Sequence, residues 1–371
     1  MRTDTVALMS PAPGTRHDLV VHRFGRPGAR PLVYVQAGLH ADELPGPLAL
    51  QVLRSRLAEV EARGMVTGEV VLVPLANPVG LAQRVLGSGV GRFDLADGGN
   101  FNRGFPALAD EAAAMLDGRL GADAAANVAA VRAVLDEVAA RRGAATPAED
   151  LKRTLLRLAL PADMVIDVHC DSEAVVHLYT LPASVAAFAP LAALAGARAV
   201  LTAEESGDEP FDEACSTPWH RLAARFPGVP LPVSCDACTL ELRGERDVSD
   251  DLASVDAAAI LDALVLRGAV AGPVPQVPAA VCAPTPLAGS EPIIAPVAGI
   301  VVFRRGPGDL VSPGDVIAEL VDPVDGTRTP LASRTAGVLY ARASARFAHP
   351  GRRLAKIAGA ELRRTGKLLS P

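Results

Sequence analysis

Continuous apolar runs recur through the first 270 residues and alternate with stretches whose apolar residues fall at helical spacing. A run that is apolar at nearly every position, rather than at every second one, is typical of a strand in a sheet covered on both faces. The predicted strands are 31–38, 68–78, 163–170, 174–182 and 197–203. The predicted helices are 46–64, 127–143 and 250–268. This alternation predicts an α/β fold with a mixed, mostly parallel central sheet flanked by helices.

Two stretches depart from this alternation. Residues 107–160 form an Ala-rich helical insertion within the first domain. After residue 270, the segment 271–292 is rich in Pro, Ala and Gly and carries little charge, which is typical of a linker or an extended crossover. We therefore expect an α/β domain over 1–270 and a linker over 271–292, followed by a domain of different character.

The last segment, 293–371, combines short predicted strands with turns that contain Gly and Pro. The stretch 295–320 is echoed by 333–358, and two such halves suit a small pseudo-symmetric β-barrel. The pattern GDLVSPGDVIAEL resembles a biotinyl/lipoyl-like domain, which carries its cofactor on a lysine at the hairpin between the halves. That hairpin has no lysine here, and the whole segment contains only Lys356 and Lys367. We expect a structural barrel, or a lid near the active site, rather than a carrier domain.

Composition narrows the class of partner. Hydrophobic residues make up 50% of the 371 residues, which indicates a globular chain, and the formal net charge is -6. That balance gives no electrostatic attraction for nucleic acid or an anionic membrane. No apolar run is long enough to span a bilayer, and the N-terminus has no secretory leader pattern. An odd count of five cysteines indicates a reducing cytoplasm. We expect a small-molecule substrate. The sequence is compatible with a homo-oligomer but does not decide the oligomeric state.

The first candidate site is in YVQAGLHADELPG, residues 34–46. His40 and Glu43 follow an apolar strand directly, three positions apart. The spacing alone favours a polar connection between strand and helix, because such pairs arise by chance. The position favours half of a metal site, because open α/β sheets bind ligands just beyond the carboxyl ends of their strands.

His169 ends a second apolar strand, in VIDVHCDSE, with Asp167 and Asp171 on either side. Two histidines and a glutamate with one open position form a standard catalytic zinc site. Asp167 is a candidate for orienting an imidazole from behind. The alternative is a histidine at a strand end that is hydrogen-bonded to a neighbour.

A Gly-rich loop, 94–106, carries Asn102 and Arg103. The arginine fork matches a carboxylate, and the asparagine beside it can donate to the same group. Arg92 is a second candidate cation nearby. The alternative for these arginines is a plain surface loop.

Glu241 lies on the apolar run CTLEL. Because buried carboxylates are rare unless they are paired or functional, Glu241 is a candidate general base beside a zinc-bound water. The alternatives are a strand-edge glutamate that faces solvent, or Glu245 in the following turn. Cys235 and Cys238 form a lone CxxC, but on a strand residues i and i+3 point to opposite faces, which disfavours a redox pair.

Five short motifs, GLHADE, the NP of LANPVG, NFNR, DVH and TLELRG, occur in this order over residues 38–244. Together they resemble the succinylglutamate desuccinylase/aspartoacylase family, which is related to the zinc carboxypeptidases. The resemblance implies one zinc ion per chain held by His40, Glu43 and His169, catalytic roles for Glu241 and Arg92, and a substrate carboxylate held by Asn102 and Arg103.

Two departures from the family pattern affect this assignment. Asn100 stands where family members often have an acid, and an inserted ADGG lengthens the spacing from Arg92 to Arg103. Arg84 is therefore an alternative to Arg92 as the arginine that polarises the scissile carbonyl.

The resemblance implies a zinc-dependent amidohydrolase that deacylates a small N-acyl amino acid, with acetyl and succinyl both open as the acyl group. Two other functions remain open: a metallocarboxypeptidase that releases a C-terminal residue, and a binding protein with a decayed zinc site. The acidic run 208–215 is a further candidate partner for a cationic side chain, although we favour a solvated loop there.

Overall fold

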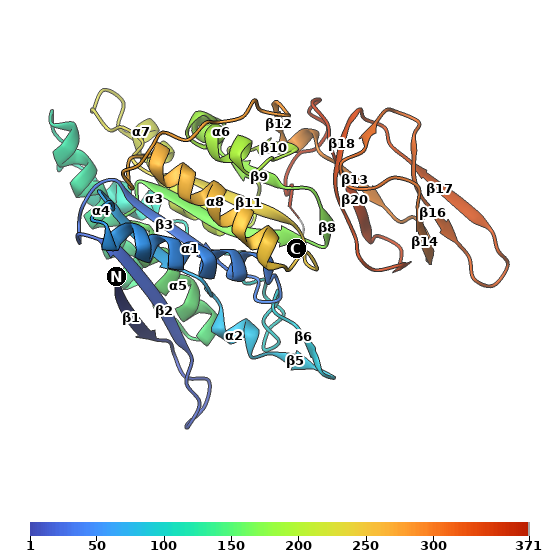
Figure 1. The fold of residues 1–371 in the computed structure, drawn as a ribbon, viewed down its shortest axis with the longest axis horizontal. Helices are drawn as coiled ribbons and strands as arrows, with labels where there is room; N and C mark the ends of the chain where they lie inside the picture. Colours follow the sequence, from blue (N-terminus) through green and yellow to red (C-terminus); the bar gives the residue numbers. More distant parts are fainter. Residues whose placement is uncertain (370–371) are drawn as a thin grey trace.

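A nine-stranded mixed sheet forms the centre of the first domain (Figure 1). The computed structural model describes residues 1–369. In spatial order the strands are β1 (Arg2–Ala7), β2 (Asp18–Gly25), β4 (Glu69–Val73), β3 (Leu32–Ala37), β7 (Met164–Asp171), β11 (Asp236–Gly244), β9 (His177–Thr180), β10 (Ala199–Thr202) and β12 (Pro284–Pro286). The central strands β4, β3, β7 and β11 run parallel, whereas β1, β2 and the β11–β9 pair are antiparallel. The predicted mixed, mostly parallel sheet is confirmed.

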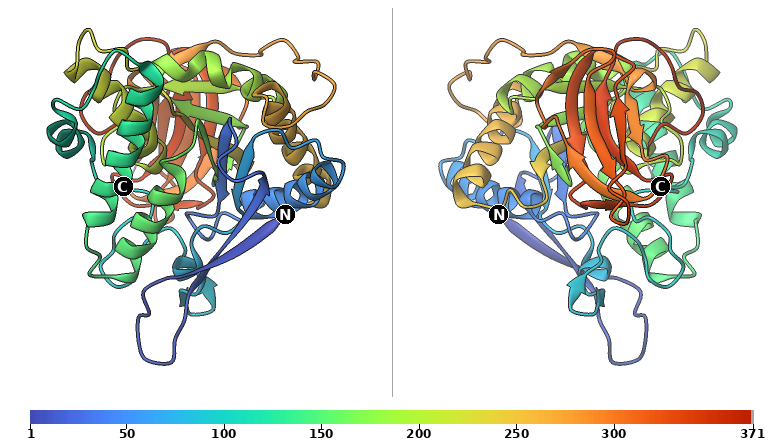
Figure 2. Two further views of the ribbon diagram at one scale, coloured as in Figure 1. Left: turned by 90° about the vertical axis from the view of Figure 1, so that its left-hand side faces the viewer. Right: turned by 90° about the vertical axis from the view of Figure 1, so that its right-hand side faces the viewer.

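Helices cover both faces of this sheet, as the two side views show (Figure 2). One face packs against α3 (Ala109–Leu116), α4 (Ala124–Arg141), α5 (Pro147–Ala159) and α7 (Phe211–Arg225). The other face packs against α1 (Pro45–Ala62), α6 (Val185–Leu194) and α8 (Asp250–Leu266). A short helix α2 (Pro78–Leu81) and a small hairpin of β5 (Arg84–Val85) and β6 (Ser88–Gly89) follow β4. The stretch 107–160 supplies α3, α4 and α5.

The local sequence explains why these elements form. All six residues of β3 are buried, as expected for a central strand covered on both faces. In α1, the leucines Leu50, Leu53 and Leu57 recur at helical spacing and are fully buried. The helix begins with a proline in its first turn, and Gly64 follows it with a φ of +71°.

The structure adds two features that the apolar pattern did not predict. The N-terminal hairpin of β1 and β2 extends one edge of the sheet. At the other edge, β12 pairs with β10, so the predicted linker 271–292 is partly built into the first domain. Both prolines of β12 are tolerated because an edge strand needs fewer backbone donors.

The C-terminal domain consists of two small sheets around their own apolar core. One sheet contains β13 (Glu291–Ile294), β20 (Arg353–Ala358), β18 (Gly337–Arg342) and β15 (Leu310–Val311), and the other contains β17 (Arg328–Ala332), β16 (Val316–Val321), β14 (Gly299–Phe303) and β19 (Phe347–Ala348). The internal duplication is visible here, because β14, β15 and β16 of the first half correspond to β18, β19 and β20 of the second. The turns before β16 and β20 each hold a glycine at positive φ, Gly314 at +94° and Gly351 at +83°.

The two domains are joined by strand pairing and ion pairs. The short strand β8 (Glu173–Ala174), just after β7, pairs with β18 of the C-terminal domain. Glu173 accepts a hydrogen bond from Arg342 at 2.6 Å, and Lys356 on β20 forms an ion pair with Asp171 at the end of β7. Within residues 1–369, none of the helices is long and apolar enough to cross a membrane.

Candidate active site

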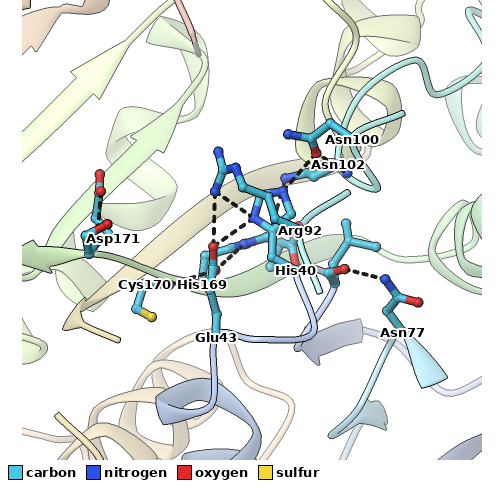
Figure 3. Close-up of polar contacts among 12 residues, drawn as sticks. His40, Glu43, Asn77, Arg92, Asn100, Asn102, His169, Cys170 and Asp171 are labelled. Atoms are coloured by element: carbon cyan, nitrogen blue, oxygen red, sulfur yellow. Dashed lines mark hydrogen bonds and ion pairs between the residues drawn. The ribbon is translucent and has the colours of Figure 1, made fainter. Parts of the chain in front are cut away.

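His40, Glu43 and His169 converge at the carboxyl ends of two neighbouring strands (Figure 3). His40 and Glu43 lie between β3 and α1, and His169 lies on β7, which pairs in parallel with β3. Glu43 joins the two rings: its Oε1 lies 2.8 Å from Nδ1 of His40, and its Oε2 lies 2.8 Å from Nδ1 of His169. All three residues are buried, and their candidate ligand atoms lie within 4.8 Å of one another.

The Nε2 nitrogens of both imidazoles are held by side chains that lie behind the candidate ligands. Nε2 of His40 lies 2.9 Å from Oδ1 of Asn100, and Nε2 of His169 lies 2.9 Å from Oδ2 of Asp167. Because Nε2 donates to these oxygens, each Nδ1 is the nitrogen left to bind a metal. Two imidazole nitrogens and a carboxylate held in this way form a donor set that suits zinc.

The charges at this cluster also fit a cation. Burial, and then the nearby Arg92, lower the pKa of His40 to about 4, which keeps its ring neutral. Burial opposes charge on His169, but Asp167 and Glu43 outweigh it and raise the pKa of His169 well above its usual range. Burial likewise opposes charge on Glu43, but the two histidines hold its pKa well below its usual range. The metal-free cluster therefore favours a proton on His169, and a metal would take the place of that proton.

A cavity of about 560 Å³ opens beside the cluster. The first domain contributes His40, Arg92, Asn102, Arg103, His169 and Glu241 to its wall. One guanidinium nitrogen of Arg92 lies 3.3 Å from Oε1 of Glu43, next to the converging ligands. Arg84, the alternative to Arg92, lies instead on the exposed hairpin strand β5.

The predicted carboxylate clamp lies on the same wall. Nδ2 of Asn102 is 3.3 Å from Nε2 of His169, and its Oδ1 accepts a hydrogen bond from the amide of Phe211. Arg103 lies next in the chain and donates to the carbonyl of Asn102 at 2.6 Å. Both residues line the cavity, and Asn102 lies directly against His169.

Glu241 reaches the cavity from β11, the strand next to β7. In the strand register Glu241 is the direct partner of His169. Its Oε2 is buried and has no hydrogen-bond partner among residues 1–369. Burial, and then the charge of Glu43, raise the pKa of Glu241 to about 8. Glu245, the alternative, lies in the exposed turn after β11.

The C-terminal domain supplies cavity residues that sequence reasoning left without a role. Tyr340, Arg342 and Lys356 line the cavity, and Lys356 pairs with Asp171 there. The signal for Lys356 was its place on a strand, RLAKIA, that is otherwise largely apolar and buried. This part of the domain forms a wall of the pocket.

The structure bears on two of the alternatives raised by the sequence. The acidic run 208–215 is wrong as a fully solvated loop, because α7 begins at Phe211, and both Phe211 and Asp212 are buried. Cys235 and Cys238 pack into the apolar clusters on opposite faces of the sheet, as their strand spacing predicted. Neither cysteine forms a disulfide.

The geometry agrees with the sequence comparison. A family model for the succinylglutamate desuccinylase/aspartoacylase catalytic domain matches residues 29–267. The chain belongs to this family. The resemblance seen in the five motifs is therefore confirmed, and membership in a family of deacylases supports a hydrolase with a small-molecule substrate. A search of curated proteins finds no match.

Solved structures share the whole architecture. A succinylglutamate desuccinylase/aspartoacylase family protein from Shewanella amazonensis is 29% identical over 96% of this chain and 98% of that chain, with a TM-score of 0.86. A protein of the same description from Shewanella frigidimarina is 24% identical over 96% and 97%, with a TM-score of 0.83. The ectoine utilization protein EutE (DoeB) from Ruegeria pomeroyi shares the fold at 19% identity over 96% and 94%, with a TM-score of 0.69.

Proposed function

We propose that this protein is a zinc-dependent amidohydrolase that removes an acyl group, acetyl or succinyl, from a small N-acyl amino acid. The observation that carries the proposal is the convergence of His40, Glu43 and His169 on one point at the cavity wall, with Glu241 beside them. Zinc bound there would supply Lewis-acid chemistry toward the acyl carbonyl and toward a water molecule. Because these three residues form a single site, we expect one zinc ion per chain.

The side chains around the cluster supply the remaining parts of an amide hydrolysis. Glu241 takes a proton from the attacking water and later delivers it to the departing amine. A neighbouring cation would lower its raised pKa, so that it starts the cycle as a carboxylate. Arg92 donates to the oxygen of the scissile carbonyl as negative charge develops on it.

The cavity favours a small substrate over a peptide. Its volume of about 560 Å³ is in the range of ordinary small-molecule sites, and residues of the C-terminal domain form part of its wall. A carboxypeptidase needs an open groove for the rest of its peptide chain. Asn102 and Arg103 would hold the carboxylate of the amino acid at one side of the pocket.

Metal content and amine release test the proposal together. Purified protein is analysed for metal and then assayed against a panel of N-acetyl and N-succinyl amino acids. Dipeptides, from which a carboxypeptidase would release the C-terminal residue, are the comparison substrates. We expect about one zinc per chain and amine release that stops on chelation and returns with zinc. Preferential cleavage of the dipeptides would favour a carboxypeptidase. Absence of zinc binding and of turnover would favour the binding-protein alternative.

Arg103→Ala is expected to weaken recognition of the substrate's carboxylate. Loss of a charge-assisted contact of about 1.5–3 kcal/mol corresponds to a fall in kcat/KM of roughly 10- to 100-fold, expressed mainly in KM. The sharper measurement compares the acyl amino acid with its carboxamide, which lacks the charge. The native enzyme should discriminate strongly between the two, whereas the variant should not.

The matched control is Arg84→Ala, which removes an exposed arginine from the nearby hairpin. It should leave kcat, KM and the preference for the acyl amino acid over its carboxamide unchanged. Full retention of discrimination in Arg103→Ala would mean that another cation recognises the carboxylate.

A further inference from the structure

A lysine of the helical insertion reaches the loop that carries the site residues. Lys152 lies on α5, whose leucines Leu151, Leu155 and Leu156 are buried against one face of the sheet. Lys152 itself is half-buried, and its ammonium points away from the apolar face to loop backbone. It donates to the carbonyl of Asn100 at 3.1 Å and to the carbonyl of Arg103 at 2.7 Å.

These contacts are made without an acidic partner. Among residues 1–369, no carboxylate lies within ion-pair distance of the Lys152 ammonium. Burial lowers the pKa of this lysine, and the more distant charges of Asp97, Asp94 and Glu149 oppose that effect. A partly buried ammonium loses solvation free energy, and these distant carboxylates offset that loss only in part, because the net shift of the pKa is downward. The two carbonyls are the groups that the ammonium contacts directly, so Lys152 is placed to hold loop backbone.

The stretch held by Lys152 contains three residues of the site. Oδ1 of Asn100 accepts from Nε2 of His40 at 2.9 Å and from the amide of Asn102 at 2.8 Å. Asn102 and Arg103 line the cavity. A shift of the Asn100 and Arg103 carbonyls would therefore move both the support of a metal ligand and the residues that face the substrate.

We propose that Lys152 is a positioning residue. Through it, the helical insertion fixes the 100–103 loop against the His40, Glu43 and His169 cluster. This inference rests on the proposed function for its consequences on zinc affinity and kinetics. This gives the insertion a structural role. Its helix α5 is fixed in the core by buried leucines, and the two hydrogen bonds of Lys152 attach the loop to that fixed helix.

Lys152→Met tests this role, because it keeps the aliphatic stem and removes the donors. We expect a 10- to 100-fold loss of zinc affinity, as is common when the support behind a metal ligand is weakened, together with a raised KM. Lys152→Arg, which keeps charge and donors on a long stem, should recover most of both. Arg157→Met is the matched control on the same helix, because Arg157 pairs with Asp136 outside the site.

A double-variant comparison separates positioning from general destabilisation. If Lys152 acts through Asn100, then Lys152→Met should change zinc affinity much less when Asn100 is already alanine. If the double variant instead loses zinc affinity by the product of the two single-variant losses, the two residues act independently and the proposal is overturned. Wild-type zinc affinity and KM in Lys152→Met would also overturn it. If that variant does not fold, Lys152→Leu carries the same comparison, since it also removes the donors.

A third readout needs neither metal nor substrate. Amide hydrogen exchange over residues 100–105 should rise in metal-free Lys152→Met and return toward the native rate in Lys152→Arg. Unchanged exchange would contradict the role of Lys152 in holding the loop. Failure of the native protein to bind zinc or to hydrolyse any acyl amino acid would instead contradict the proposed function, and the exchange result would still decide the role of Lys152.

Discussion

Glu241→Gln is expected to leave the zinc content at about one per chain and to lower kcat by roughly 10²- to 10⁴-fold, the usual contribution of a general acid–base group. The amide preserves the size of the side chain but cannot take a proton from water. Glu241 makes no hydrogen bond to His40, Glu43 or His169, so the donor set should survive the change. The measurement pairs metal analysis with steady-state kinetics on the preferred acyl amino acid.

Glu245→Gln is the matched control, because this glutamate lies four residues further on, in the exposed turn after β11. It should retain native turnover. If Glu241→Gln hydrolyses substrate at the native rate while Glu245→Gln does not, Glu245 is the residue that transfers the proton. If Glu241→Gln loses its zinc as well as its activity, then Glu241 supports the metal rather than moving a proton.

The sheet could be predicted where its strands are fully buried. The apolar run of β3 is buried at every position, and a continuous run is the pattern that such strands leave in sequence. The N-terminal strand β1 leaves no such run, because most of its residues face solvent at the sheet edge. The edge strand β12 was read as part of a linker for a related reason, since its three residues are Pro, Thr and Pro.

The convergence of the candidate metal ligands was predictable because topology concentrates them. His40 and His169 follow or end strands that pair in parallel, and the carboxyl ends of such strands meet at one edge of the sheet. Two short motifs far apart in the chain could therefore be assigned to one place. The motif order of a known family strengthened the assignment, and the family itself is now shown by the match over residues 29–267.

The supporting lysines could not be predicted in this way. Lys152 reaches carbonyls 49 and 52 residues away, and Lys356 reaches a carboxylate 185 residues away. Neither contact follows from a local period or motif, because each depends on how separate helices and domains pack together. Sequence patterns indicate which residues carry chemistry, whereas the packing decides which residues hold them in place.

Glu43→Gln is expected to abolish stoichiometric zinc binding, and hydrolysis with it. Glu43 is the centre of the cluster: its oxygens face Nδ1 of both histidines, and Oε2 also accepts a hydrogen bond from the amide of Cys170 at 3.1 Å. The amide of glutamine has no negative charge and only one oxygen, so it is a weak zinc ligand. A near-isosteric change keeps the packing, which makes metal loss the first effect to be seen.

Thermal unfolding of chelator-treated protein measures this loss directly. Adding free zinc at about 100 times its Kd should stabilise the native protein by about 2.7 kcal/mol, which raises Tm by on the order of 5 °C. Glu43→Gln should show little or no shift. Glu59→Gln, an exposed change on the following helix α1, should behave as the native protein does. An equal zinc-dependent shift in Glu43→Gln would mean that the metal binds elsewhere, and the assigned ligand set would have to be abandoned.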